Sequence, residues 1–190
     1  IDGVDEVCGD GLDNDCNPDT FCVYAVDMFG GNVSAIEPMA KGVDPVTFYK
    51  AASSADTEYT ASNKLTLLMS ENDAMGKAIH FILDKSEDGD GGNLAVNLSG
   101  TPGMDILVYD DPPEEASDSW SYDPATGTGA ITWVWGQCCV DGMVLAPLKA
   151  DQCLMVEILS SDGLEGIQIW NDASTSTELG LKTFQLCGWL

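Results

Sequence analysis

The sequence contains no arginine and one histidine, and its seven lysines face 32 acidic residues, which leaves a formal net charge of −25. We therefore expect no nucleic-acid partner, because phosphate recognition depends on arginine forks and basic patches. Divalent cations are instead the natural counter-charge. Since 44% of the residues are hydrophobic, the composition indicates a folded protein with an acidic surface rather than a disordered chain.

Long apolar runs are also missing. No stretch approaches the roughly eighteen consecutive apolar residues of a membrane-spanning helix, so we expect no membrane span. The chain begins at Ile1, which is not a translation start, and we interpret it as a mature form whose leader has been removed. We therefore expect a secreted protein that acts in the extracellular space or at the cell surface.

Seven cysteines fit an oxidising compartment better than the cytosol. Because the number is odd, one thiol must stay free, bind a metal or pair with another molecule. Two of them are adjacent in the sequence, which leaves either a vicinal disulfide or two separate partners. The candidates for disulfide formation are Cys8, Cys16, Cys22, Cys138, Cys139, Cys153 and Cys187.

From Phe21 onward, short apolar runs alternate with turn residues, as in FCVYAVD, KLTLLMS and KAIHFIL. About ten such runs predict an all-β fold, an antiparallel β-sandwich over residues 21–190. Only the run DPVTFYKAAS predicts a helix, with Asp44 as its cap and Pro45 at the first helical position. Residues 1–20 are rich in Asp, Gly and Asn and predict a separate, irregular arm that needs disulfides or a ligand for order.

The arm carries acidic or amide side chains at every second position: Asp13, Asp15, Asn17 and Asp19. This spacing lets a looped backbone turn alternate oxygens onto one centre, as the first ligands of an EF-hand do. The EF-hand itself is not matched, because Pro18 replaces its required glycine and Tyr24 its bidentate glutamate. We interpret the stretch as a calcium-binding loop that is not an EF-hand and is closed by a Cys8–Cys16 disulfide. A plain acidic disulfide loop is the alternative.

The run EVCGDGLDNDC, Glu6 to Cys16, resembles the short cysteine and aspartate repeat of secreted bacterial surface proteins of the MopE type, a repeat named for presumed metal binding. The resemblance covers this short run only. It implies an exported protein with metal affinity. Because the repeat decorates many unrelated proteins, it says little about the remaining chain.

A second acidic cluster pairs VYDDPPEEASDSW with WVWGQCCVDG, and this pairing resembles the β-rich domain of MopE and CorA type surface proteins of methanotrophs. The resemblance implies that four acidic residues meet at one end of the sandwich as a second calcium site: Asp110, Asp111, Glu114 and Asp141. Each also has a simpler interpretation. Asp110 and Asp111 suit a turn before Pro112, and Asp141-Gly142 is a common turn pair.

Family members of that type bind copper through two histidines and a tryptophan oxidised to kynurenine. This chain departs from that pattern, because its one histidine, His80, lies in the apolar run KAIHFIL with no tryptophan near it in sequence. A copper(I) site would need soft ligands such as Met69, Met75 or a cysteine beside His80. A lone histidine in an apolar strand is more often a packed or surface residue.

The sequence contains neither of two common catalytic motifs, G-x-S-x-G and H-E-x-x-H. A single histidine also leaves the usual zinc centres short of ligands, so we expect no enzyme. We expect a secreted, cell-surface calcium-binding β-sandwich with a structural or adhesive role. One alternative is a subunit that assembles with copies of itself into an extracellular fibre or sheath, stabilised by calcium and by strand or disulfide exchange. The other is a copper(I)-binding surface protein for copper acquisition, with His80 as ligand.

Overall fold

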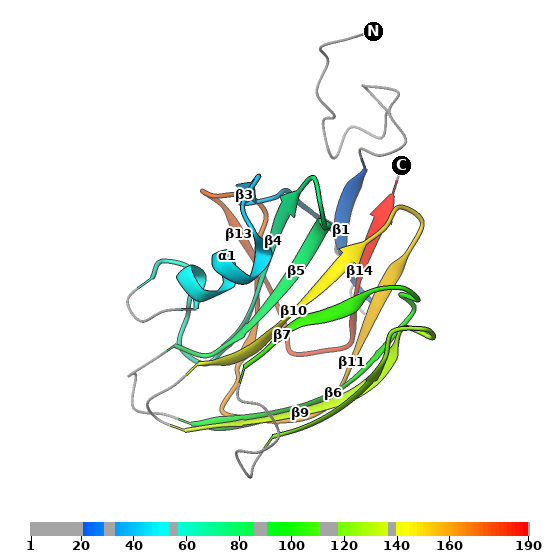
Figure 1. Cartoon of the computed structure of the whole chain (residues 1–190). Helices are drawn as coiled ribbons and strands as arrows, with labels where there is room; N and C mark the ends of the chain where they lie inside the picture. Colours follow the sequence, from blue (N-terminus) through cyan, green and yellow to red (C-terminus); the bar gives the residue numbers. More distant parts are fainter. Residues whose placement is uncertain are drawn as a thin grey trace, which may run out of the picture.

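The computed structural model describes residues 21–28, 33–53, 57–85, 91–110, 118–136 and 140–189. These residues form two β-sheets that share one hydrophobic core, with one short helix on the outside (Figure 1). The all-β sandwich predicted from the sequence is confirmed. The predicted acidic arm, residues 1–20, lies outside the described residues.

The first sheet, sheet A, has the strand order β2-β1-β14-β11-β6-β9-β8. Every neighbouring pair in it is antiparallel, as the sequence predicted. Its strands are β1 (Cys22–Asp27), β2 (Val33–Ile36), β6 (Gly92–Ser99), β8 (Ser119–Asp123), β9 (Thr128–Trp135), β11 (Cys153–Asp162) and β14 (Phe184–Trp189).

The second sheet, sheet B, has the order β13-β12-β4-β5-β10-β7, and a further strand, β3, also pairs with β4. The expectation of a purely antiparallel sandwich is wrong here, because β12 and β3 both run parallel to β4. The strands of sheet B are β3 (Ala40–Lys41), β4 (Lys64–Asn72), β5 (Gly76–Leu83), β7 (Asp105–Tyr109), β10 (Asp141–Leu148), β12 (Gly166–Trp170) and β13 (Ser176–Leu179).

The described residues contain fourteen strands rather than the roughly ten predicted. Each apolar run identified in the sequence is a strand. The four additional strands are β2, β3, β8 and β13. Three of these lie at the edges of their sheets, and β3 has only two residues. An edge strand such as β8 exposes most of its side chains, so it does not carry the apolar alternation that marks the inner strands.

The central strands β4, β5 and β10 are buried on both faces, which explains their continuous apolar sequences. One face of sheet B packs against sheet A, for example through Leu67, Phe81 and Met143. The other face carries a second apolar cluster that includes Leu68 and Val144. Sheet B is therefore the middle layer of the molecule.

Helix α1 (Pro45–Ala52) covers part of the outer face of sheet B and confirms the predicted helix. The Asp44 carboxylate accepts a hydrogen bond from the Thr47 backbone N–H at 2.9 Å, and Pro45 occupies the first turn, where no N–H is needed. Tyr49 and Ala52 pack into the second apolar cluster. No helix among the described residues is long and apolar enough to cross a membrane.

One disulfide joins Cys153 of β11 to Cys187 of β14, which are neighbouring strands of sheet A. Cys22, at the start of β1, is also disulfide-bonded. Three of the seven predicted candidates are therefore confirmed as disulfide cysteines. The other four, Cys8, Cys16, Cys138 and Cys139, lie outside the described residues.

Asp84 ties the two sheets together at one end of the sandwich. It follows β5 with a φ of 66°, in the left-handed region, and is 1% exposed. One carboxylate oxygen accepts from the Asn63 backbone N–H at 2.7 Å, and the other accepts from the Trp135 indole N–H at 2.9 Å. Because Trp135 ends β9 of sheet A, the second bond crosses between the sheets.

We predict that Asp84→Ala lowers the free energy of unfolding by about 3 kcal/mol, because a buried indole N–H and a half-buried backbone N–H lose their charged acceptor. The matched control is Asp151→Ala, since Asp151 also has a positive φ, of 60°, but an exposed side chain. That control should lose only about 1 kcal/mol, the cost of an alanine in the left-handed region. Urea unfolding at 25 °C measures both variants, and equal losses would contradict the role assigned to the Asp84 side chain.

Candidate functional site

Two residues of the predicted second calcium site, Asp110 and Asp141, lie together at one end of sheet B. Asp141 begins β10 opposite Leu83, the last residue of β5. Asp110 follows β7, and its backbone N–H donates to the Gly142 carbonyl at 3.0 Å. Both carboxylates are thus attached to the ends of paired, well-packed strands. The other two predicted ligands, Asp111 and Glu114, lie outside the described residues.

The hydroxyl of Tyr49 joins this pair of acids to helix α1. It donates a hydrogen bond to Asp110 Oδ2 at 2.8 Å, and the tyrosine is 2% exposed. Burial raises the pKa of Tyr49, and the negative charges of Asp110 and Asp141 raise it further. The hydroxyl therefore stays protonated and remains a donor at any physiological pH.

Gly142 makes room for this arrangement. A Cβ at this position would come within 2.7 Å of the Tyr49 hydroxyl oxygen and still closer to the Phe81 carbonyl. Any larger residue would push the tyrosine away from Asp110. In the sequence the pair Asp141-Gly142 could also be interpreted as a simple turn. In the structure these are the first two residues of the buried strand β10.

Two further acids near this end, Asp84 and Asp118, were not singled out in the sequence. Asp118 accepts from the Val134 backbone N–H at 2.7 Å and from the Tyr109 hydroxyl at 3.4 Å. Like Asp84, it uses its carboxylate to fix the end of a strand. Nothing in the sequence separates these structural acids from the other acidic residues, because Asp84 simply follows an apolar run and Asp118 lies in a polar, acidic stretch.

No group of three or more His, Cys, Asp or Glu side chains able to hold a metal occurs among the described residues. The four residues of the predicted N-terminal calcium loop, Asp13, Asp15, Asn17 and Asp19, lie outside them. Within the described part, the site therefore consists of Asp110, Asp141 and the Tyr49 hydroxyl. Its two carboxylates supply oxygen ligands, which suit calcium rather than a soft metal.

His80 lies on the outer face of sheet B beneath helix α1 and has no exposed surface. Its Nε2 is 2.7 Å from the Ser70 hydroxyl oxygen. The rings of Phe48 and His80 form a T-shaped pair with their centroids 5.1 Å apart. Met69 belongs to the core on the opposite face of the same sheet, and Met75 lies in the turn between β4 and β5. The structure therefore does not bring these two methionines next to His80 as copper ligands.

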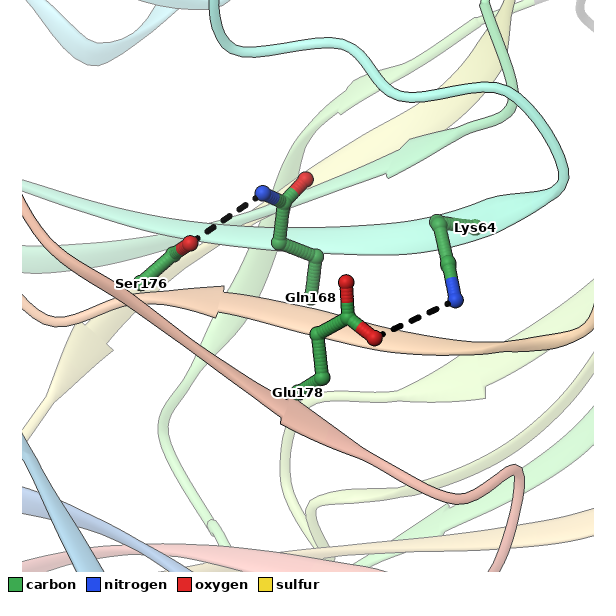
Figure 2. A network of polar contacts seen from close by, with 4 residues as sticks. All are labelled: Lys64, Gln168, Ser176 and Glu178. Carbon is green, nitrogen blue, oxygen red and sulfur yellow. Dashed lines mark hydrogen bonds and ion pairs between the residues drawn. The ribbon is translucent and has the colours of Figure 1, made fainter.

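The outer face of sheet B carries polar side chains on β4, β5 and β12. Within the described residues, four buried side-chain atoms there have no hydrogen-bond partner: Thr66 Oγ1, His80 Nδ1, Gln168 Oε1 and Trp170 Nε1. Figure 2 shows Gln168 donating its amide N–H to Ser176 at 3.2 Å, beside the Lys64–Glu178 ion pair at 3.5 Å. Buried polar atoms of this kind are usually satisfied by ordered water.

Burial lowers the pKa of His80 to about 3, so the imidazole is neutral at physiological pH. In the unfolded chain the same group protonates near pH 6.5. Between these two values the unfolded state binds the extra proton and the folded state does not. The free energy of unfolding must therefore fall as the pH drops from about 6.5 towards 3.

We predict that between pH 7 and pH 4.5 the wild-type protein loses about 2–3 kcal/mol more stability than the variant His80→Gln, which cannot protonate. Carboxylate titrations are common to both proteins and cancel in the comparison. Urea unfolding at each pH gives the difference. Because the chain has a single histidine, the imidazole NMR signal reports the protonation of His80 directly. A titration midpoint of this signal near pH 6.5 in the folded protein would contradict the expected effect of burial on the His80 pKa.

Comparison with models of protein families, with curated proteins and with solved structures found no match. The likeness of the run Glu6 to Cys16 to a MopE-type repeat remains a prediction from the sequence. The assignment of function therefore depends on the residues themselves and on the geometry described above.

Proposed function

We propose that the protein is a secreted calcium-binding β-sandwich with a structural or adhesive role at the cell surface and no catalytic activity. The observation that carries the proposal is the convergence of Asp110 and Asp141 beside the Tyr49 hydroxyl. Both carboxylates act electrostatically on the same hydroxyl group, and a divalent cation bound to them would offset their like charge.

The position of the acid pair supports calcium in particular. Calcium takes six to eight oxygen ligands and tolerates irregular geometry, so strand ends and loops suit it. Asp110 is followed in the sequence by Asp111 and Glu114, the other two acidic residues predicted for the same ion. With 32 acidic residues against seven lysines, such a cation would also reduce the repulsion across the whole chain.

A location outside the cell agrees with the disulfide chemistry. The Cys153–Cys187 bond and the disulfide at Cys22 are typical of proteins that fold in an oxidising compartment. Extracellular calcium is abundant, so a weak site suffices there. The proposed role is therefore stabilisation of the folded sandwich, and of surfaces built from it, by calcium taken from the medium.

Thermal unfolding with and without calcium tests the proposal. We predict that calcium raises the melting temperature of the wild-type protein, with about 2.7 kcal/mol of added stability when free calcium is 100 times Kd. The double variant Asp110→Asn, Asp141→Asn should lose most of this increase. Asp73→Asn, an exposed acid in the turn between β4 and β5, is the matched control and should keep it.

A third variant, Asp13→Asn with Asp15→Asn, separates the predicted N-terminal loop from the site at the end of sheet B. If only this variant loses the calcium effect, calcium binds to the arm and not to the strand ends. A wild-type melting temperature that is the same in calcium and in chelator would contradict the proposal as a whole.

Self-assembly into a fibre or sheath is the second candidate. In its favour, β8 lies at the edge of sheet A as the described residues define it, and Trp120 on this strand is 41% exposed. An open edge with an exposed aromatic residue is a surface on which another strand can pair. We predict calcium-dependent large particles in size-exclusion chromatography, reduced in Trp120→Lys, which replaces the exposed aromatic residue of the edge strand with a charge. A monomer under all calcium conditions would exclude this role.

A further inference from the structure

A cavity of about 610 Å³ lies at the opposite end of sheet B from Asp110 and Asp141. Strand β10 connects the two places, since it begins at Asp141 and its last residues line the cavity. Apart from Lys149, the lining side chains are apolar and include Phe21, Met75, Leu107 and Leu148. Lys149 supplies the one charged side chain of the lining, which contains no acidic residue.

Two local features of the backbone lie beside the cavity. The β4–β5 turn is fixed by Asn72, whose side-chain oxygen accepts the backbone N–H groups of Ala74 at 3.1 Å and of Met75 at 2.8 Å. On the facing side, the pairing of β10 with β5 shifts register between Leu145 and Leu148. Proline at position 147, which has no N–H, falls inside this shift. The walls are therefore built into the sheet rather than formed by loose side chains.

Two lysines lie at the cavity, and within the described part of the chain only one of them, Lys77, is paired with an acidic side chain. Lys77 forms an ion pair with Glu71 at 2.6 Å and lies 5.1 Å from the centre of the Phe21 ring, so it supports the wall. Lys149 makes no ion pair within the described residues, where the three ion pairs belong to Lys64, Lys77 and Lys182. The Lys149 Nζ lies beside Gly103, 3.0 Å from the position that a Cβ would occupy at that glycine.

We propose that this cavity binds a small apolar monoanion, namely a carboxylate with a short hydrocarbon tail. The tail would pack against the apolar walls and the carboxylate would pair with Lys149. The volume lies within the range of about 300–1,000 Å³ that is usual for small-molecule sites, which are mostly apolar with few polar groups. A lysine in an acid-free lining selects an anion, although the protein as a whole carries a charge of −25.

Three ligands of equal chain length test the proposal: octanoate, octan-1-ol and octylammonium. Non-specific attraction to an acidic protein would favour octylammonium and disfavour octanoate. The proposed site gives the opposite order, with octanoate bound about two- to fivefold more tightly than octan-1-ol, the range expected for a partly exposed ion pair. Isothermal titration at physiological ionic strength measures the three affinities.

Two pairs of variants locate the binding. Ala74→Trp fills the cavity from an exposed turn position and should abolish octanoate binding, whereas Ala173→Trp, in an exposed turn that does not line the cavity, should not. Lys149→Met should remove the preference for octanoate over octan-1-ol while the alcohol still binds. Lys41→Met is its control, because Lys41 is exposed and outside the lining.

The proposal is overturned if octanoate does not bind, if octylammonium binds most tightly, or if Ala74→Trp and Ala173→Trp bind octanoate equally. Equal binding of octanoate and octan-1-ol by the wild-type protein would also overturn it, since the cavity would then be an apolar site without charge selection. Urea unfolding of each variant confirms that a lost signal reflects a filled cavity and not an unfolded protein.

Discussion

Sheet B depends on being covered on both faces. Its central strands carry apolar side chains in both directions, so the sheet is stable only with sheet A on one side and helix α1 with its neighbouring loops on the other. The helix is short and has few residues of high helical propensity, so it owes its stability mainly to this packing. The Tyr49 hydroxyl is held beside Asp110 by the same contact. The candidate site is thus a product of the second hydrophobic layer.

Much of the fold could be predicted because burial leaves a pattern in the sequence. The inner strands alternate or run continuously with apolar residues, and the helix begins with a cap and a proline that identify it directly. The edge strands β8 and β13 could not be found, because exposed side chains carry no such constraint, and β2 has only four residues, too few to show an apolar pattern. The parallel pairing of β12 with β4 was also hidden, since it joins residues roughly a hundred positions apart and depends on the order of strands in space.

The candidate site was predictable only in part. Asp110 and Asp141 stand next to apolar runs, and a resemblance to known surface proteins singled them out. Tyr49 was missed, because a tyrosine in a short helix gives no sign of which carboxylate its hydroxyl will meet. The cavity at the far end of β10 was missed for a similar reason, because it results from a register shift between strands. For His80 the apolar run left a packed and a surface position open, and the structure places the residue in a fully buried position.

Tyr49 contacts both Asp110 of the acidic pair at the strand ends and the buried imidazole of His80. Its hydroxyl bonds to Asp110, while its ring stacks on His80 with centroids 6.4 Å apart. A cation that takes Asp110 Oδ2 as a ligand must share that oxygen with the hydroxyl proton of Tyr49. Binding at the strand ends and the seating of helix α1 are therefore thermodynamically linked, and the linkage is reciprocal. If the acid pair binds a cation as proposed, a partner that contacts α1 would change the affinity for that cation without touching either carboxylate.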